Sequence, residues 1–88
     1  MKTVNAVYLS ARDNCATLTD DADEGDVITF SLDGVDGSVT ARGRVPRWHK
    51  TATAPIKRGE PVYKYGSAIG TAFEDIAPGD HVHIHNIR

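Results

Sequence analysis

Apolar residues alternate with polar residues over short runs along this chain, and they seldom recur at the three- and four-residue spacing of an amphipathic helix. Gly, Pro, Asp or Asn interrupts these runs every few residues, a pattern typical of a small protein made of short β-strands. We therefore expect an all-β fold with little helix. The predicted strands cover residues 4–9, 15–18, 27–32, 38–41, 48–53, 62–65, 69–73 and 81–87.

Two Asp-Gly pairs follow the third predicted strand. They are Asp33-Gly34 and Asp36-Gly37. Glycine accepts the positive φ that tight turns demand, so we expect these pairs to form a hairpin connection. The hairpin is expected to project from the body of the domain.

One short segment is repeated along the chain. Residues 56–62 read IKRGEPV, residues 76–82 read IAPGDHV, and a fainter copy at 23–28 reads DEGDVI. Each copy predicts a turn with glycine at the bend, an acidic residue that bonds nearby backbone donors, and a strand entered through valine. The repetition indicates a folded-over β-structure, although two clear copies do not establish a solenoid.

The length of the chain bounds its architecture. A chain of 88 residues forms one compact domain, residues 1–88, and such a domain buries only about 60 to 65% of the surface of its unfolded form. A hydrophobic share of 40% and a charged share of 25% are those of globular proteins, which excludes wholesale disorder. A partner chain would add core that this chain lacks.

Charge and cysteine content exclude several functional classes. The net charge is −2 and the ten Lys and Arg residues are scattered, so the basic footprint of a nucleic-acid-binding protein is missing. The single cysteine, Cys15, permits no internal disulfide, and we expect it in the core of a protein from a reducing compartment. The acidic run at 20–26 lacks the ligand spacing of a calcium loop and is interpreted as solvated.

The hydropathy pattern bears on localisation. No apolar run reaches the roughly 18 residues of a membrane-spanning helix, and the N-terminal residues do not resemble a signal peptide. We therefore expect a soluble, cytoplasmic protein that does not act at a membrane.

Histidines are concentrated at the end of the chain. In a strand over 81–87, the two-residue period places His81, His83 and His85 on one face, while the apolar residues between them serve the core. Same-face side chains lie about 7 Å apart at their Cα atoms, close enough for two imidazoles to converge on one metal ion or one substrate anion. All three could bind one metal only if the strand bends. The alternative is the water-facing side of an edge strand.

Two further groups of residues are candidates for binding. Trp48, His49 and Lys50 follow one another, and a lysine charge beside an imidazole could grip a carboxylate. The alternative is a surface loop with Trp48 folded onto the core. Tyr63 and Tyr65 share a face of their predicted strand, where they either line a wet cleft or pack in the ordinary way.

Several short motifs occur in one order along the chain: Val45-Pro46 with His49-Lys50, then Gly59 to Val62, Lys64-Tyr65-Gly66, Ile69-Gly70, and Val82 to Asn86. This order resembles the N-terminal domain of the altronate and galactarate dehydratase family, which some members carry as a separate small subunit. Among stand-alone proteins, the chain resembles the small subunits of altronate dehydratase-like enzymes and of (2R)-sulfolactate sulfo-lyase. The resemblance covers nearly the whole chain and implies a small β-clip fold of the SAF type.

The resemblance also implies a chemistry. In this family a proton is removed α to a carboxylate, the β-hydroxyl leaves, and the product is a 2-keto-3-deoxy acid; a divalent metal, iron(II) in several members, acts as Lewis acid. A large catalytic lyase subunit is expected to carry most of this machinery, so the chain is not expected to be catalytic alone.

Candidate site residues follow from the motifs and the spacing together. The residues expected to contact the acidic sugar substrate are His49, Lys50, Tyr65, His83, His85 and Asn86. The candidate metal ligands are His81, His83 and His85.

At two positions the chain departs from the family's pattern. Trp48 replaces the usual glycine before the His-Lys pair, and Thr71 replaces the arginine that often follows Ile69-Gly70. Both departures bear on the substrate more than on the fold. Two other functions stay open: a non-enzymatic carbohydrate- or anion-binding β-clip module, and a metal-binding protein built on the three histidines. The oligomeric state is also open, including a homo-oligomer.

Overall fold

The computed structural model describes all residues from Met1 to Arg88, which form eight β-strands and no helix. The all-β prediction is therefore confirmed. A helix long and apolar enough to cross a membrane does not occur in the structure. The strands are β1 (Thr3–Val7), β2 (Cys15–Leu18), β3 (Val27–Leu32), β4 (Val35–Thr40), β5 (Lys50–Ala52), β6 (Pro61–Lys64), β7 (Ser67–Thr71) and β8 (His81–Val82).

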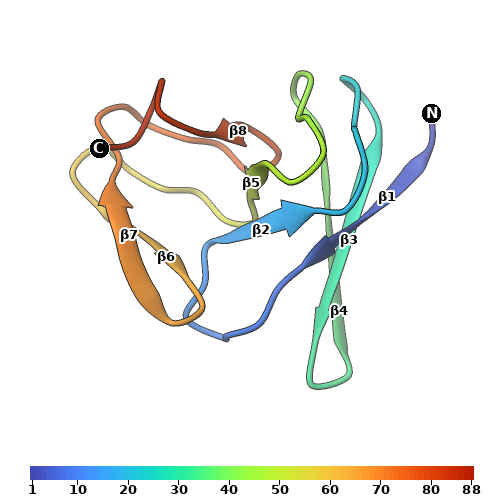
Figure 1. The fold of residues 1–88 in the computed structure, drawn as a ribbon, viewed down its shortest axis with the longest axis horizontal. Helices are drawn as coiled ribbons and strands as arrows, with labels where there is room; N and C mark the ends of the chain where they lie inside the picture. The colour runs from blue at the N-terminus through green and yellow to red at the C-terminus, as the bar shows by residue number, and fades with distance from the viewer.

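Six of the strands form one sheet, in the order β4-β3-β1-β2-β5-β8, and β6 pairs with β7 in a separate hairpin (Figure 1). The β1–β3 pair is parallel and all other pairs are antiparallel. Asn14 ties the hairpin to the start of β2, because its side chain donates to the Pro61 carbonyl and accepts from the Tyr63 N–H. Residues distant in sequence are thus held side by side.

The interior is divided into two small aliphatic clusters without a buried aromatic ring. One surrounds β5, β6 and β8 and consists of Cys15, Ala52, Ile56, Val62, Ala72, Ile76 and Val82. The other lies between β1, β2 and β3 and consists of Val4, Leu18, Ala22, Ile28, Ala41 and Val45. The prediction that Cys15 is a small core residue is confirmed.

The repeated segments form three turns of one geometry. In each, the third residue is a glycine with φ between 89° and 92°, as in a type II turn. The closing acidic residue accepts a hydrogen bond from the backbone N–H of the first residue, as the sequence predicted. The pairs are Asp26 with Asp23 (2.9 Å), Glu60 with Lys57 (2.7 Å) and Asp80 with Ala77 (2.8 Å).

A fourth turn of the same kind, at residues 46–49, is not apparent in the sequence. The His49 N–H donates to the Pro46 carbonyl at 3.0 Å, which matches the backbone closure of the other three turns. Trp48 occupies the glycine position with φ 69°, and His49 occupies the position of the acidic residue. The four turns are joined in two pairs by the isolated bridges Ala22 to Val45 and Ile56 to Ile76.

The β3–β4 hairpin extends away from the rest of the domain (Figure 1). Its turn is Asp33-Gly34, with φ values of 51° and 79°, as predicted. The prediction for Asp36-Gly37 was wrong, because both residues pair within β4. Packing explains this glycine: a Cβ at Gly37 would collide with the ring of Phe30 on the paired strand.

The predicted last strand is much shorter than expected. Only His81–Val82 is a strand, and the chain then turns back so that the N–H groups of Asn86 and Ile87 both donate to the His83 carbonyl. Ile84, expected in the core, is therefore 80% exposed, whereas Ile87 packs against the first cluster. The other strand ends differ from the prediction by a few residues.

Candidate functional site

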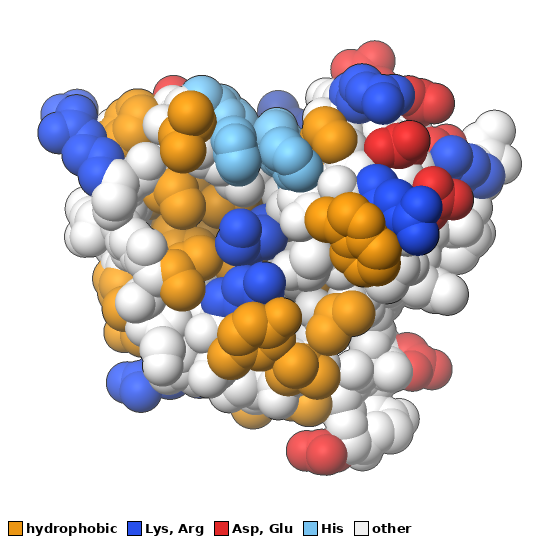
Figure 2. All heavy atoms as spheres, viewed as in Figure 1, with side chains coloured by type: hydrophobic (Ala, Val, Ile, Leu, Met, Phe, Trp, Pro, Cys, Tyr) orange, Lys and Arg blue, Asp and Glu red, His pale blue; other side chains and the backbone are white.

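Histidines from two distant segments meet at the β5–β8 edge of the sheet, and they form one group on the face shown in Figure 2. The antiparallel register places Lys50 opposite Val82 and Thr51 opposite His81. His49 directly precedes β5, so its ring lies beside that of His81. His49 Nδ1 and His81 Nε2 are 2.9 Å apart, a hydrogen bond in which one ring donates and the other accepts.

The turn after β8 brings the two remaining histidines to the same place. The ring centroid of His83 lies 4.5 Å from that of His49 and 5.4 Å from that of His81, with the His81 and His83 planes only 10° apart. The ring of His85 lies 5.1 Å from that of His81. We call these four side chains the histidine cluster. The sequence predicted the grouping of His81, His83 and His85, but a turn and not a straight strand produces it.

Three members of the cluster have the geometry to hold a metal ion. Ligand nitrogens of His49, His81 and His83 lie within 4.8 Å of one another. The set predicted from spacing contained His85 and not His49. Sequence reasoning did not include His49 among the candidate metal ligands because the pairing of β5 with β8 is a tertiary contact that no local pattern reveals.

Two members of the cluster, His81 and His83, favour the neutral imidazole. Burial, followed by the neighbouring imidazole of His85, lowers the pKa of His81 to about 4. Burial and the ring of His49 also lower the pKa of His83. Near neutral pH both rings therefore offer one donor and one acceptor nitrogen.

Asn86 holds the turn that carries the cluster. Its side chain is buried, with 3% exposed, and its amide nitrogen donates to the His81 carbonyl at 2.8 Å. Its amide oxygen accepts from the His83 N–H at 3.0 Å. Asn86, expected to touch substrate, thus bonds the backbone on either side of Val82 and fixes where the two imidazoles emerge.

Lys50 adds a positive charge to the same region. It is half-buried on β5, and its ammonium contributes to the lowered pKa values of His81 and His83. Figure 2 shows basic side chains directly below the histidines. The structure therefore brings together four of the predicted site residues, His49, His81, His83 and His85, and places Lys50 on the adjoining strand β5.

Tyr65 does not join this group. It lies in the turn between β6 and β7, with φ 55° and 56% exposed, and the tip of this hairpin is far from β8 (Figure 1). Its backbone N–H donates to the carboxylate of Asp13, and the Lys64 ammonium lies 4.5 Å from the centre of its ring.

Trp48 stands beside the cluster on the fourth turn. It is 60% exposed and stacks with the guanidinium of Arg47 at 4.8 Å, so it is not folded onto the core. Its positive φ of 69° is unusual for a bulky residue. Glycine adopts a positive φ without steric strain, which explains why the family pattern has glycine at this position.

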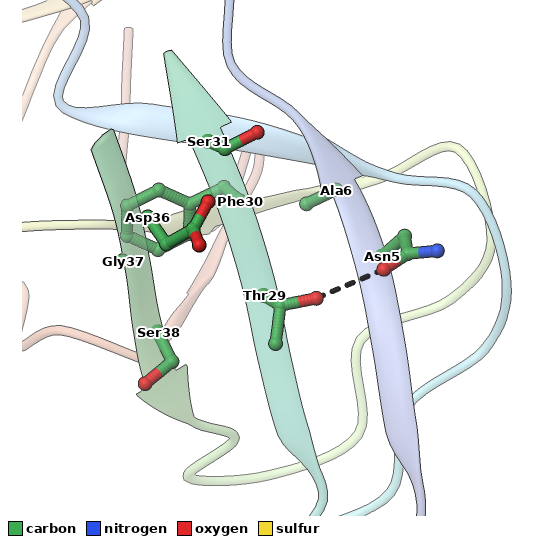
Figure 3. Close-up of a pocket in the computed structure, with 8 residues that line it drawn as sticks. All are labelled: Asn5, Ala6, Thr29, Phe30, Ser31, Asp36, Gly37 and Ser38. Atoms are coloured by element: carbon green, nitrogen blue, oxygen red, sulfur yellow. Dashed lines mark hydrogen bonds between the residues drawn. The ribbon is translucent and has the colours of Figure 1, made fainter. Parts of the chain in front are cut away.

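Two hollows differ in their chemistry. A polar hollow of about 290 Å³ borders the cluster and is lined by His81, His85, Arg42 and Asp80, among others. A larger hollow of about 710 Å³ lies over β1, β3 and β4 (Figure 3). Asn5, Thr29 and Ser38 contribute amide and hydroxyl groups there, but no cation lines it. Only the first hollow is next to the residues expected to act on an anion.

Cys15 is not a candidate nucleophile. Its side chain is buried beside β6, where the thiol donates to the Tyr63 carbonyl at 3.4 Å. Burial raises the pKa of the thiol to about 11, so the thiolate is scarce at neutral pH. The candidate site is therefore the histidine cluster with the adjoining Lys50.

Comparison with known proteins supports a lyase relationship over nearly the whole chain. A family model described as altronate/galactarate dehydratase SAF domain matches residues 4–88. The altronate dehydratase of Escherichia coli is 44% identical over 82 residues, which are 93% of this chain and 16% of that protein. The altronate dehydratase of Bacillus subtilis is 39% identical over 51 residues, 58% of this chain and 10% of that protein.

A much shorter relative has a different name. The (2R)-sulfolactate sulfo-lyase subunit alpha of Paracoccus pantotrophus is 39% identical over 56 residues, which are 64% of this chain and 84% of that subunit. This chain thus spans a small part of the altronate dehydratases and most of the sulfo-lyase subunit. The eight-stranded domain with its histidine cluster belongs to the altronate/galactarate dehydratase SAF domain family.

Proposed function

We propose that this chain is the small subunit of a two-subunit carbon-oxygen lyase, a sugar-acid dehydratase of the altronate or galactarate type. It completes the substrate cleft of a large catalytic subunit and is inactive alone. The observation that carries the proposal is the convergence of four histidines at the β5–β8 edge, next to Lys50 on β5, in a domain from this family. Ammonium and imidazole groups are suited to binding a carboxylate.

Lys50 is the proposed anchor for the substrate carboxylate. A base on the large subunit removes the proton α to this carboxylate, the β-hydroxyl leaves as water, and the enol tautomerises to a 2-keto-3-deoxy acid. Negative charge grows on the carboxylate as the proton departs, so a cation fixed beside it stabilises the transition state more than the substrate. A divalent metal in the holoenzyme, iron(II) by family resemblance, supplies Lewis acidity.

The imidazoles are proposed to orient the substrate and assist the leaving hydroxyl. His49, His83 and His85 can each donate a hydrogen bond to a substrate oxygen from the rim of the cluster. Asn86 acts through the turn it holds. Contact between Tyr65 and substrate stays a prediction, since its hairpin tip lies away from the cluster.

A sulfo-lyase small subunit is the second candidate, and one observation favours it. The alignment covers 84% of the Paracoccus pantotrophus sulfo-lyase subunit alpha, against 16% of the Escherichia coli altronate dehydratase. Its substrate would carry a sulfonate as leaving group beside the carboxylate. The same basic and imidazole groups suit both acids, because each acid carries a carboxylate.

Reconstitution tests the proposal. The chain is co-purified with the large lyase subunit that the proposal requires, and turnover of altronate, galactarate and (2R)-sulfolactate is measured for the chain, the large subunit and the complex. We expect activity only in the complex, and the accepted acid identifies the candidate. Turnover by the chain alone, or full activity of the large subunit without it, contradicts the proposal.

A further inference from the structure

We propose that His49, His81 and His83 bind one first-row transition-metal dication through three imidazole nitrogens and leave its remaining coordination positions open to a small ligand. This ligand set replaces the one predicted from spacing along the last strand. The inference concerns the chain by itself and does not depend on its partner or its reaction.

The distances between the ligand nitrogens are close to those of a metal site. Metals of the zinc class bind imidazole at about 2.0 to 2.1 Å, which in a tetrahedral site separates the ligand atoms by about 3.3 Å. His49 Nδ1 and His81 Nε2 are 2.9 Å apart, and the nitrogen of His83 lies within 4.8 Å of both. Small side-chain rotations would therefore bring three nitrogens into coordination distance.

The donor set selects the class of metal. Imidazole nitrogen suits zinc, copper, nickel, cobalt and iron(II), whereas magnesium and calcium require oxygen ligands. The ligand group consists of histidines alone. Iron(II), implied by the family resemblance, belongs to the favoured class. Three protein ligands with an open position are also the arrangement of catalytic and not of structural zinc sites.

The backbone at all three positions is held in place without a metal. His49 is tied at both backbone groups, since its carbonyl accepts from the Leu18 N–H and its own N–H donates to Pro46. Asn86 bonds the backbone of His81 and of His83. Residues whose backbone is anchored in this way lose little conformational entropy when they bind a metal, and this raises the affinity for the metal.

Two neighbouring residues, Lys50 and His85, bear on the site. The Lys50 ammonium opposes a bound cation, but together with the metal it makes the open coordination position attractive to an anion such as a carboxylate. His85 lies outside the triad, with its ring 5.1 Å from that of His81 alone. Removing His85 should therefore leave the three ligands in place.

Metal titration of the 88-residue chain tests the assignment. Binding of Zn²⁺ is measured by calorimetry and of Co²⁺ by visible absorption, for the wild type and for His49→Ala, His81→Ala, His83→Ala and His85→Ala. We expect one ion per chain. Mutation of a residue that only supports a metal ligand lowers metal affinity by about 10- to 100-fold. Each of the first three variants should lower the affinity by more than this, because each removes a ligand. His85→Ala should lower the affinity by less than about tenfold.

Nitrogen NMR of the unmutated chain keeps the test independent of folding defects in the variants. Addition of Zn²⁺ should shift His49 Nδ1 and His81 Nε2 together with one nitrogen of His83. Absence of stoichiometric binding overturns the proposal, as does loss of binding in His85→Ala with retention in His49→Ala. Metal binding by a chain whose complex has no lyase activity would leave this inference standing and remove only the proposed function.

Discussion

Three of the four turns close on a carboxylate, and the fourth closes on His49. All four share the same backbone closure, and the two pairs are joined by equivalent bridges. In the first three, the closing side chain bonds the N–H that begins its own turn. In the fourth, the first residue is Pro46, which has no N–H to donate, and the ring of His49 contacts His81 instead.

This difference shows how one copy of a repeated turn leaves its closing side chain available for other contacts. A carboxylate used inside its own turn stabilises the fold and is not available to a ligand. Because Pro46 offers no such N–H donor, His49 is free to face the neighbouring strand. In the fourth turn, Trp48 also stands at the position that is glycine in the other three turns, and its positive φ strains the backbone there. Strain and uncommitted side chains thus coincide at the candidate site.

Substitution of a glycine in a carboxylate-closed turn should have the largest effect. A Cβ at Gly79 would overlap the backbone oxygen of Thr40, and its φ of 91° is unfavourable for alanine. We expect Gly79→Ala to lower the free energy of unfolding by about 3 kcal/mol or more, measured by urea denaturation. Gly25→Ala is the matched control, because Gly25 has a φ of 92° but an added Cβ would meet no atom within 4 Å. This variant should lower the free energy of unfolding by only about 1 kcal/mol. Equal losses would mean that the contact with Thr40 is unimportant.

Removal of the Lys50 charge tests the function assigned to the region of the fourth turn. A charge-assisted hydrogen bond in a sheltered cleft contributes about 1.5 to 3 kcal/mol, so Lys50→Met should lower kcat/KM of the reconstituted complex by about one to two orders of magnitude. Lys57→Met is the control, because Lys57 is exposed on a carboxylate-closed turn. Small and equal losses in both variants would remove Lys50 from the substrate site.

Replacement of Trp48 by glycine should relieve strain at the fourth turn. With φ 69° at this position, Trp48→Gly is expected to raise the free energy of unfolding by up to about 1 kcal/mol. Trp48→Ala removes the same ring but keeps the Cβ, and it should give no gain. If the two variants are equally stable, the positive φ does not strain the native turn.

Acid should weaken a carboxylate-closed turn. The N–H groups of Asp23 and Lys2 donate to Asp26 and lower its pKa below the ordinary value of 3.8. A carboxylate whose pKa is lower in the folded than in the unfolded state stabilises the fold when the pH is above the unfolded pKa. This stabilisation is lost as the pH falls through the folded pKa. Urea denaturation from about pH 5 to pH 2 should show declining stability, with a shallower decline in Asp26→Asn. An identical decline in both proteins would contradict this role.

Local patterns in the sequence determined the fold class and several elements. The strands at Cys15–Leu18 and Val27–Leu32 and the Asp33-Gly34 turn follow from alternation and from glycine conformation, and these depend on near neighbours. The three turns with a glycine and a carboxylate were also predictable, because their hydrogen bonds join residues only three positions apart. The family was recognised from the order of motifs and is confirmed over residues 4–88.

Tertiary structure alone decided how the candidate site is assembled. Alternation predicted a strand to residue 87, but the buried side chain of Asn86 bonds the backbone of His81 and His83 and stabilises a turn instead. The pairing of β5 with β8 then brings His49 to these histidines across 32 residues of sequence. A local pattern cannot encode that contact, because it depends on which strand edges remain unpaired after the rest of the sheet has formed.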